Sequence, residues 1–148
     1  MTLLEKIKKY FFNKRIEKYL KTTKDDIDFI VNLYAVIVYL DKQVKQIEIL
    51  NSFNLLDGYI RLKFKKLDED KIKDIETYAK ELFYQKLHEF KAIEGSFELL
   101  KQEILSTLRK IKNKKLYRNI LIIINSDNIV TDKENQFIVE MQKIYNEG

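Results

Sequence analysis

The pattern of apolar positions predicts helices along most of the chain. Apolar residues recur every three to four positions, the spacing that places them on one side of a helix. The predicted helices cover residues 3–20, 24–40, 46–56, 68–92, 96–111, 116–124 and a last stretch that begins at 131. No Pro- or Gly-rich linker divides them. The sequence therefore predicts an all-α, single-domain bundle of six or seven helices around one core.

The predicted helices differ in how much of their surface is apolar. The segment 24–40 has almost no polar face, which predicts a central buried helix, and Thr22-Thr23 provide its cap signal. The segment 116–124 is also apolar nearly all round. The third predicted helix is expected to close near Asp57-Gly58, and residues 59–67 fit no single pattern.

The first predicted helix changes its apolar side half-way along. One side of its first half carries Leu3, Leu4, Ile7, Tyr10 and Phe11. The apolar residues from Phe12 onward lie about 150° away on the helical wheel. Either the helix kinks near Phe12-Asn13 or its two halves pack against different surfaces. A helix buried from both sides, within the chain or in a dimer, is the simpler interpretation; a detachable basic amphipathic arm is the alternative.

Two segments of the chain repeat one pattern, in which a buried helix leads into an Asp, a Val three residues later and a Glu seven residues later. The copies read Asp41, Val44 and Glu48, and Asp127, Val130 and Glu134. Their distance along the chain exceeds the period of a solenoid repeat, so the pattern indicates a pseudo-duplicated helix–acidic corner–helix unit.

Physical chemistry assigns a role to each position of these corners. The Asp lies where the chain turns, and Asn128 tolerates the left-handed conformation that such turns use. Val44 and Val130 are expected to point inward. Thr131 and Glu134 form the pattern of a capping box, in which each side chain bonds the other's backbone N–H. The first copy has Lys45 in place of the Thr, so its cap is expected to be poorer.

The same acidic residues are candidates for binding a hard divalent cation, Ca²⁺ or Mg²⁺. The candidate metal ligands are Asp41, Glu48, Asp127, Asp132 and Glu134. The Asp-x-Asp-x-Asp-Gly run of an EF-hand is missing, and helix capping is the simpler role for these acids. If either corner binds a cation, the second has the better ligands.

The repeated corners resemble the DGxVxxxE signature of the TerB-like family of tellurite-resistance domains, which also occurs at the N-terminus of a membrane-anchored J-domain co-chaperone. The Gly of that signature is Lys42 in the first copy and Asn128 in the second. The resemblance covers residues 25–146. It implies an all-helical, pseudo-symmetric, stress-associated and non-enzymatic domain at 25–148, with a divalent-cation site at the acidic corners. The basic segment 1–24 lies outside the resemblance, and we expect it to form a helix that packs on this domain or extends from it.

Composition excludes several kinds of chemistry. Cys is absent, which excludes disulfides and thiolate sites, and His88 is the single histidine. No Ser-centred elbow, phosphate-binding loop or dinucleotide fingerprint occurs. We therefore expect a protein that is not an enzyme, with His88 at the surface or satisfied in the core.

The net charge of +5 is unevenly distributed. Residues 1–24 carry eight basic and two acidic residues, and residues 109–118 carry six basic residues and no acidic one. The candidate polyanion-binding residues are Lys8, Lys9, Lys14, Arg15, Arg109, Lys110, Lys112, Lys114, Lys115 and Arg118. Nucleic-acid binding requires the two segments to form one face, whereas the simpler interpretation is that both are solvated helix surfaces.

These patterns together predict a non-catalytic, TerB-like interaction module in a stress-response or envelope-linked assembly. Its expected partner is another protein, including a second copy of itself. The alternative function is binding of a polyanion, with an anionic membrane contacted through residues 1–20 as one form and nucleic acid as the less favoured one. Without a signal peptide or a membrane-spanning run, the protein is expected in the cytoplasm, with the inner membrane as a candidate peripheral site.

Overall fold

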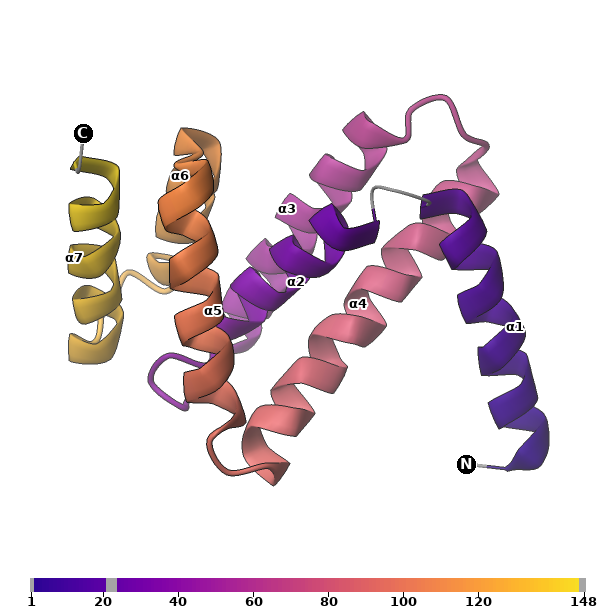
Figure 1. Ribbon diagram of the computed structural model, residues 1–148, viewed down its shortest axis with the longest axis horizontal. Helices are drawn as coiled ribbons and strands as arrows, with labels where there is room; N and C mark the ends of the chain where they lie inside the picture. The colour runs from indigo at the N-terminus through magenta and orange to yellow at the C-terminus, as the bar shows by residue number, and fades with distance from the viewer. Residues whose placement is uncertain (1, 21–23, 147–148) are drawn as a thin grey trace.

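The computed structural model describes residues 2–20 and 24–146, except for the side chains of residues 16–20. This part of the chain contains seven helices and no strand. They are α1 (Leu3–Leu20), α2 (Lys24–Val38), α3 (Gln46–Lys63), α4 (Glu69–Ala92), α5 (Ser96–Ile111), α6 (Lys114–Ile124) and α7 (Asp132–Asn146) (Figure 1). The predicted all-α, single-domain fold is confirmed. The predicted cap at Thr22-Thr23 lies outside the described residues.

Helix α2 forms the centre of the core, as its lack of a polar face predicts. It contacts α3, α4, α5 and α6, and Leu33, Tyr34 and Ile37 are almost fully buried. The helix ends at Val38, two residues before the expected end. The last turn tightens because the N–H groups of Tyr39 and Leu40 bond carbonyls three residues earlier, at 3.2 and 3.3 Å.

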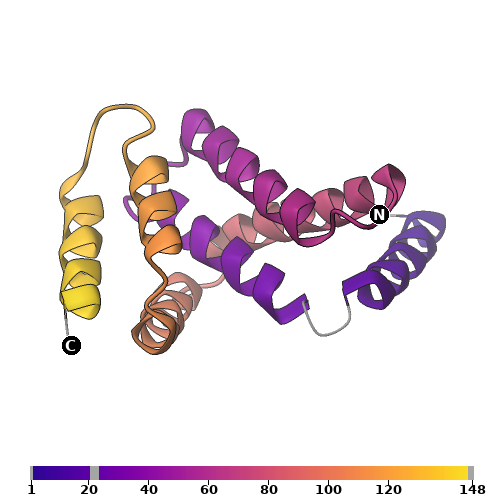
Figure 2. The ribbon, with the colours of Figure 1, turned by 90° about the horizontal axis from the view of Figure 1, so that it is seen from above.

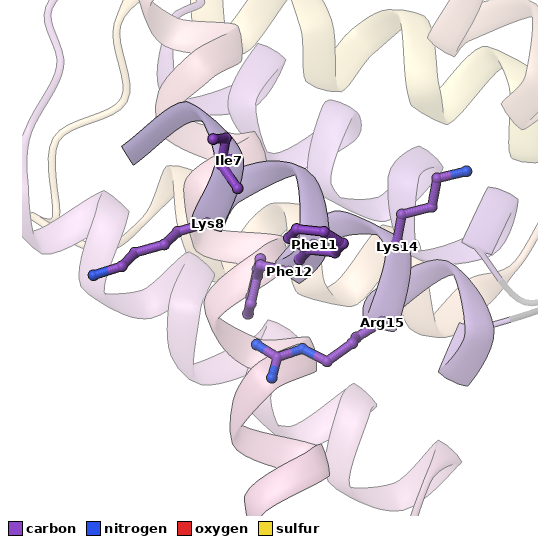
Figure 3. A pocket seen from close by; sticks show the side chains of 6 residues that line it. All are labelled: Ile7, Lys8, Phe11, Phe12, Lys14 and Arg15. Carbon is purple, nitrogen blue, oxygen red and sulfur yellow. The ribbon is translucent and has the colours of Figure 1, made fainter. Parts of the chain in front are cut away.

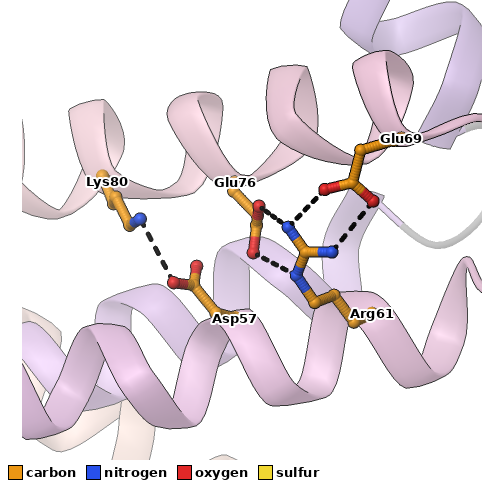
Figure 4. Close-up of polar contacts among 5 residues, drawn as sticks. All are labelled: Asp57, Arg61, Glu69, Glu76 and Lys80. Atoms are coloured by element: carbon orange, nitrogen blue, oxygen red, sulfur yellow. Dashed lines mark hydrogen bonds and ion pairs between the residues drawn. The ribbon is translucent and has the colours of Figure 1, made fainter.

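Helix α3 contradicts the expected end at Asp57-Gly58, because it continues through Gly58 to Lys63. The extension buries Ile60 completely in the core. It also places Arg61 against α4, where the guanidinium donates to both carboxylate oxygens of Glu69 and of Glu76 (Figure 4). Contacts with a neighbouring helix therefore outweigh the weak helix propensity of Gly.

The remaining helices lie around α2, with α1 and α7 at opposite ends. α1 contacts α4 near the start of α4 and then diverges from it toward the N-terminus (Figure 1). α7 packs on α5 and α6, and the view from above shows the same order (Figure 2). α6 also carries Lys114, Lys115 and Arg118, and only one of its sides faces the core, so Ile122 is 50% exposed while Ile120 and Ile123 are buried.

Candidate functional sites

The two acidic corners have the same backbone geometry, although their sequences differ. In the first corner, the Asp41 Oδ1 accepts a hydrogen bond from the N–H of Gln43 at 3.0 Å. In the second, the Asp127 Oδ1 accepts from the N–H of Ile129 at 3.1 Å. Each Asp thus closes a turn by bonding the backbone two residues on. The repeat seen in the sequence is therefore also a repeat in structure.

The residue after each Asp has left-handed backbone conformation, with φ of 63° at Lys42 and 62° at Asn128. The N–H of Lys42 bonds the carbonyl of Tyr39 at 2.9 Å, and the N–H of Asn128 bonds that of Asn125 at 3.1 Å. Asn adopts this conformation readily, whereas Lys is strained by its Cβ. This geometry explains why a Gly would suit the position.

The caps of the two following helices differ as expected. Before α7, the N–H of Thr131 donates to the Glu134 Oε1 at 2.9 Å, and the N–H of Glu134 donates to the Thr131 Oγ1 at 3.3 Å. The predicted capping box is confirmed. Before α3, the cap residue is Lys45, whose side chain makes no cap hydrogen bond. Glu48 is 1% exposed, and neither of its carboxylate oxygens accepts a hydrogen bond from the described residues.

The two corners also meet in space. The Lys45 ammonium lies 2.6 Å from the Asp127 Oδ2, and the Asn51 amide donates to the Ser126 Oγ at 2.7 Å. The ion pair raises the pKa of Lys45 and lowers that of Asp127. Burial, followed by the negative charge of nearby Glu134, raises the pKa of Glu48 to about 8. The two halves of the pseudo-duplicated domain therefore share one electrostatic cluster.

The five candidate metal ligands do not form a metal cage. Asp41, Glu48, Asp127 and Glu134 belong to the shared cluster, whereas Asp132 is exposed in the first turn of α7. Among the side chains that the structure describes, those of residues 2–15 and 24–146, no three His, Asp or Glu side chains are placed so that they could hold a metal ion. The cation present in the cluster is the ammonium of Lys45. The corner geometry supports capping and ion pairing.

The two corner valines have different environments. Val44 packs against the core, as expected, but Val130 is 41% exposed, so its predicted inward orientation is wrong. The reason is the position of the second corner. It leads into α7, which lies at the end of the molecule, whereas the first leads into α3, which contacts α2, α4 and α6.

The two basic segments do not form one surface. Lys8, Lys9, Lys14 and Arg15 are exposed on α1. Arg109, Lys110, Lys112, Lys114, Lys115 and Arg118 are exposed around the junction of α5 and α6. These two regions lie on either side of α2 and α4 in both views (Figures 1 and 2). The fold therefore does not combine the two segments into a single polyanion-binding face.

Helix α1 presents an apolar surface to solvent. It is one continuous helix from Leu3 to Leu20. We call its exposed apolar residues the α1 row: Leu3 (75% exposed), Leu4 (61%), Ile7 (43%), Tyr10 (57%) and Phe11 (60%). Burial from both sides within the chain is wrong for this half of the helix, because every residue from 2 to 11 is exposed.

The other side of α1 connects it to the domain. Phe12 is half-buried and packs against the core.

Figure 3 shows Ile7, Phe11 and Phe12 lining a shallow hollow on α1, with the charged ends of Lys8, Lys14 and Arg15 around it. The Lys14 ammonium lies 5.6 Å from the centre of the Tyr10 ring, and the Arg15 guanidinium lies 5.9 Å from that of Phe12. Aliphatic stems thus extend along the apolar surface while the charges stay in water.

A groove between α2, α3 and α6 carries no signal in the sequence. Its volume is about 570 Å³, and Phe29, Leu55 and Leu116 are among its apolar lining residues. The Asn119 amide donates to the Tyr34 hydroxyl there at 3.1 Å, and burial raises the pKa of Tyr34 to about 12. The groove brings together helices that are distant in sequence, so no local pattern could have indicated it.

Two further observations bear on function. His88 is exposed on α4, in agreement with a surface histidine. None of the helices in the described part of the chain is both long and apolar enough to cross a bilayer.

Comparison with known proteins identified no relative. A scan of protein-family models, a search of curated proteins and a search of solved structures each found no match to this chain. The TerB-like resemblance stays a prediction, and the function has to be argued from the residues of the chain itself.

Proposed function

We propose that this chain is a non-catalytic interaction module that docks on a larger partner surface through the α1 row. The observation that carries the proposal is the exposure of five large apolar side chains on one side of one helix. Scattered exposed apolar residues are normal on soluble proteins, but a contiguous group marks an interaction surface.

The N-terminus of α1 is built to present this row as a formed helix. The N–H of Glu5 donates to the Thr2 Oγ1 at 3.1 Å, and the N–H of Thr2 donates to a Glu5 carboxylate oxygen at 3.4 Å. This capping box stabilises the first turn, and the contact of Phe12 with the core anchors the helix further along. A preformed helix loses less conformational entropy on docking than a disordered segment would.

In this proposal the acidic corners are the frame of the module. The ion pair of Lys45 with Asp127 and the bond of Asn51 with Ser126 hold together two halves that are far apart in sequence. Ca²⁺ or Mg²⁺ binding at the second corner stays a prediction. Isothermal titration at millimolar cation concentration tests it, and the absence of heat would exclude it.

The wider roles implied by the family resemblance also stay predictions: tellurite resistance, stress response and association with the inner membrane. Binding of nucleic acid is the weaker alternative, since it has only the charge of two separate basic segments to support it. It also leaves the α1 row without a role.

A substitution that removes the α1 row without touching the core tests the proposal. We expect the triple variant Leu4→Ser, Ile7→Ser, Phe11→Ser to melt within a few degrees of the wild type, because these side chains are exposed. In size-exclusion chromatography of a lysate of its native cells, we expect the wild type to elute with large, partner-bound assemblies. The variant should elute instead at the size of the free protein.

The matched control is the double variant Leu99→Ser, Ile122→Ser, which removes exposed apolar side chains on α5 and α6. It should keep the wild-type distribution. Unfolding of the triple variant would show that the row stabilises the fold. An elution profile unchanged from that of the wild type would show that the row does not dock. Either result contradicts the proposal.

A further inference from the structure

The charges around the α1 row indicate which surface it fits. We infer that the row docks on an anionic lipid bilayer, with α1 lying in the plane of the headgroups. This inference rests on the proposed function, since it names the partner of the same surface. It follows from the charges beside the row, from the side of α1 that holds the domain, and from the position of α1 in the fold.

The half of α1 that carries the row is rich in cations. Between residues 2 and 15 the chain has five basic residues and a single acidic one, Glu5, which is bound to the backbone of Thr2. The five are Lys6, Lys8, Lys9, Lys14 and Arg15, and all are exposed. A helix with an apolar side and flanking cations binds at the boundary of headgroups and acyl chains, where anionic lipid attracts the cations.

The aromatic residues of the row suit the same boundary. Tyr10 and Phe11 are 57% and 60% exposed and their rings lie edge to face, 5.5 Å apart. Tyr combines an apolar ring with a polar hydroxyl, which favours the depth of the headgroups. The Lys14 ammonium lies 5.6 Å from the centre of the Tyr10 ring, so a lipid phosphate bound to it would lie beside the ring.

The position of α1 lets a flat surface reach the row. α1 forms one end of the molecule and its N-terminal half diverges from α4 (Figure 1). Phe12, which packs on the core, follows Phe11 by about 100° around the helix, and all five side chains of the row stay exposed, so the body of the domain does not cover the row. Docking on a bilayer therefore needs no rearrangement of the core.

A second copy of the chain fits this surface less well. Pairing of two α1 rows would bring the flanking cations of both copies together, and repulsion between like charges opposes it. Five side chains also cover little area compared with a stable interface, which buries roughly 1,200–2,000 Å² in total. An anionic bilayer attracts these cations instead of repelling them, and its surface is much larger than the row.

The test uses the full chain and unilamellar vesicles, with co-sedimentation as the measurement. We expect the chain to bind vesicles of phosphatidylcholine mixed with phosphatidylglycerol at least tenfold more strongly than vesicles of phosphatidylcholine alone. The preference for the anionic vesicles should decline as the salt concentration is raised, because ions screen the attraction between the Lys and Arg side chains and the lipid headgroups. The chain has no Trp, so Tyr10→Trp provides a single reporter whose emission should shift to shorter wavelength on binding.

Two pairs of variants separate the apolar from the charge contribution. Ile7→Glu, Phe11→Glu should abolish vesicle binding, whereas the control Leu99→Glu, Ile122→Glu on α5 and α6 should not. Lys6→Gln, Lys8→Gln, Lys9→Gln should lower binding at least tenfold. The charge-matched control, Arg109→Gln, Lys110→Gln, Lys115→Gln at the α5–α6 junction, should lower it little. Circular dichroism of each variant confirms that it is folded.

The outcomes distinguish the inference from the proposed function. Equal binding to both kinds of vesicle, or equal loss with both charge variants, overturns the inference. If no vesicle binds and Ile7→Glu, Phe11→Glu converts a dimer into a monomer in analytical ultracentrifugation, the row docks on a second copy; the inference fails and the proposed function stands. If the row variants change neither vesicle binding, self-association nor the cellular assemblies, both fail.

Discussion

The first and second acidic corners share a backbone but differ in how they satisfy their charges. The helix cap of the second is self-contained, because Thr131 and Glu134 cap each other within one turn of helix. The first is not, since Glu48 is buried without a hydrogen bond from the described residues and Lys45 pairs with Asp127 across the domain. The turn geometry thus persists when the capping chemistry changes, provided that a neighbouring element supplies the missing interaction.

The difference has a consequence for pH. A buried carboxyl without hydrogen bonds favours its neutral form, so the folded pKa of Glu48 is raised to about 8 from its ordinary value of 4.5. Between these values the folded state binds more protons at Glu48 than the unfolded state does. Its contribution to stability is therefore fully present below the unfolded pKa and is lost as pH rises through the folded pKa.

Glu48→Gln should produce the largest effect, because it removes this titration. We expect the variant to be about 2–3 kcal/mol more stable than the wild type at pH 9, where Glu48 must be charged, and about equal to it at pH 5. Urea denaturation at both pH values measures the difference. A stability difference that does not change with pH would show that Glu48 is ionised in the folded protein already at pH 5.

Lys45→Ala should come next, because it breaks the connection between the corners. Removing the ammonium leaves Asp127 without its ion-pair partner and Glu48 nearer to uncompensated negative charge. We expect a loss of about 2 kcal/mol at pH 7, measured by urea denaturation, against no loss for Lys110→Ala on the surface of α5. A double-mutant cycle with Asp127→Asn isolates the pair, and additive effects would mean that the two residues do not interact.

Thr131→Ala tests the self-contained helix cap of the second corner. Loss of the hydroxyl removes the bond to the N–H of Glu134 and should destabilise the protein by about 1 kcal/mol. Thermal melts followed by circular dichroism measure it. Thr107→Ala, which removes an exposed hydroxyl inside α5, is the control and should change stability less. Equal effects of the two variants would argue against a capping role.

The smallest expected effect compares the left-handed residues. Lys42→Gly should stabilise the protein by about 0.5–1 kcal/mol, because Gly relieves the strain at φ of 63° by more than it loses in entropy. Asn128→Gly should change stability by only a few tenths of a kcal/mol, since Asn already tolerates that conformation. A larger gain at Asn128 than at Lys42, measured by urea denaturation, would contradict the strain argument.

Much of the fold could be predicted because it depends on residues close together in sequence. The sequence pattern located the seven helices of the described residues, and the predicted start of the last one at Thr131 lies one residue before the start of α7 at Asp132. The poorer cap of the first corner followed from one substitution, Lys45 in place of Thr. Each of these features involves groups within about one turn of helix, so the sequence contains the whole interaction.

The failures of prediction share the opposite property. α3 continues past Gly58 because Ile60 meets the core and Arg61 meets two carboxylates of α4. Val130 is exposed because the second corner leads into α7, which packs on α5 and α6 at one end of the molecule, whereas the first leads into α3 beside α2. In both cases the way in which helices distant in sequence pack together decided the outcome.

The candidate sites divide in the same way. The sequence by itself determined that the first helix has two apolar sides and that two acidic corners exist, because both are matters of spacing along the chain. Only the tertiary structure decided that Phe12 meets the core while the α1 row faces solvent, and that Lys45 joins a corner 82 residues away. The physical reason is that burial and long-range ion pairs depend on which surfaces the packed helices bring together, and local periodicity carries no information about that choice.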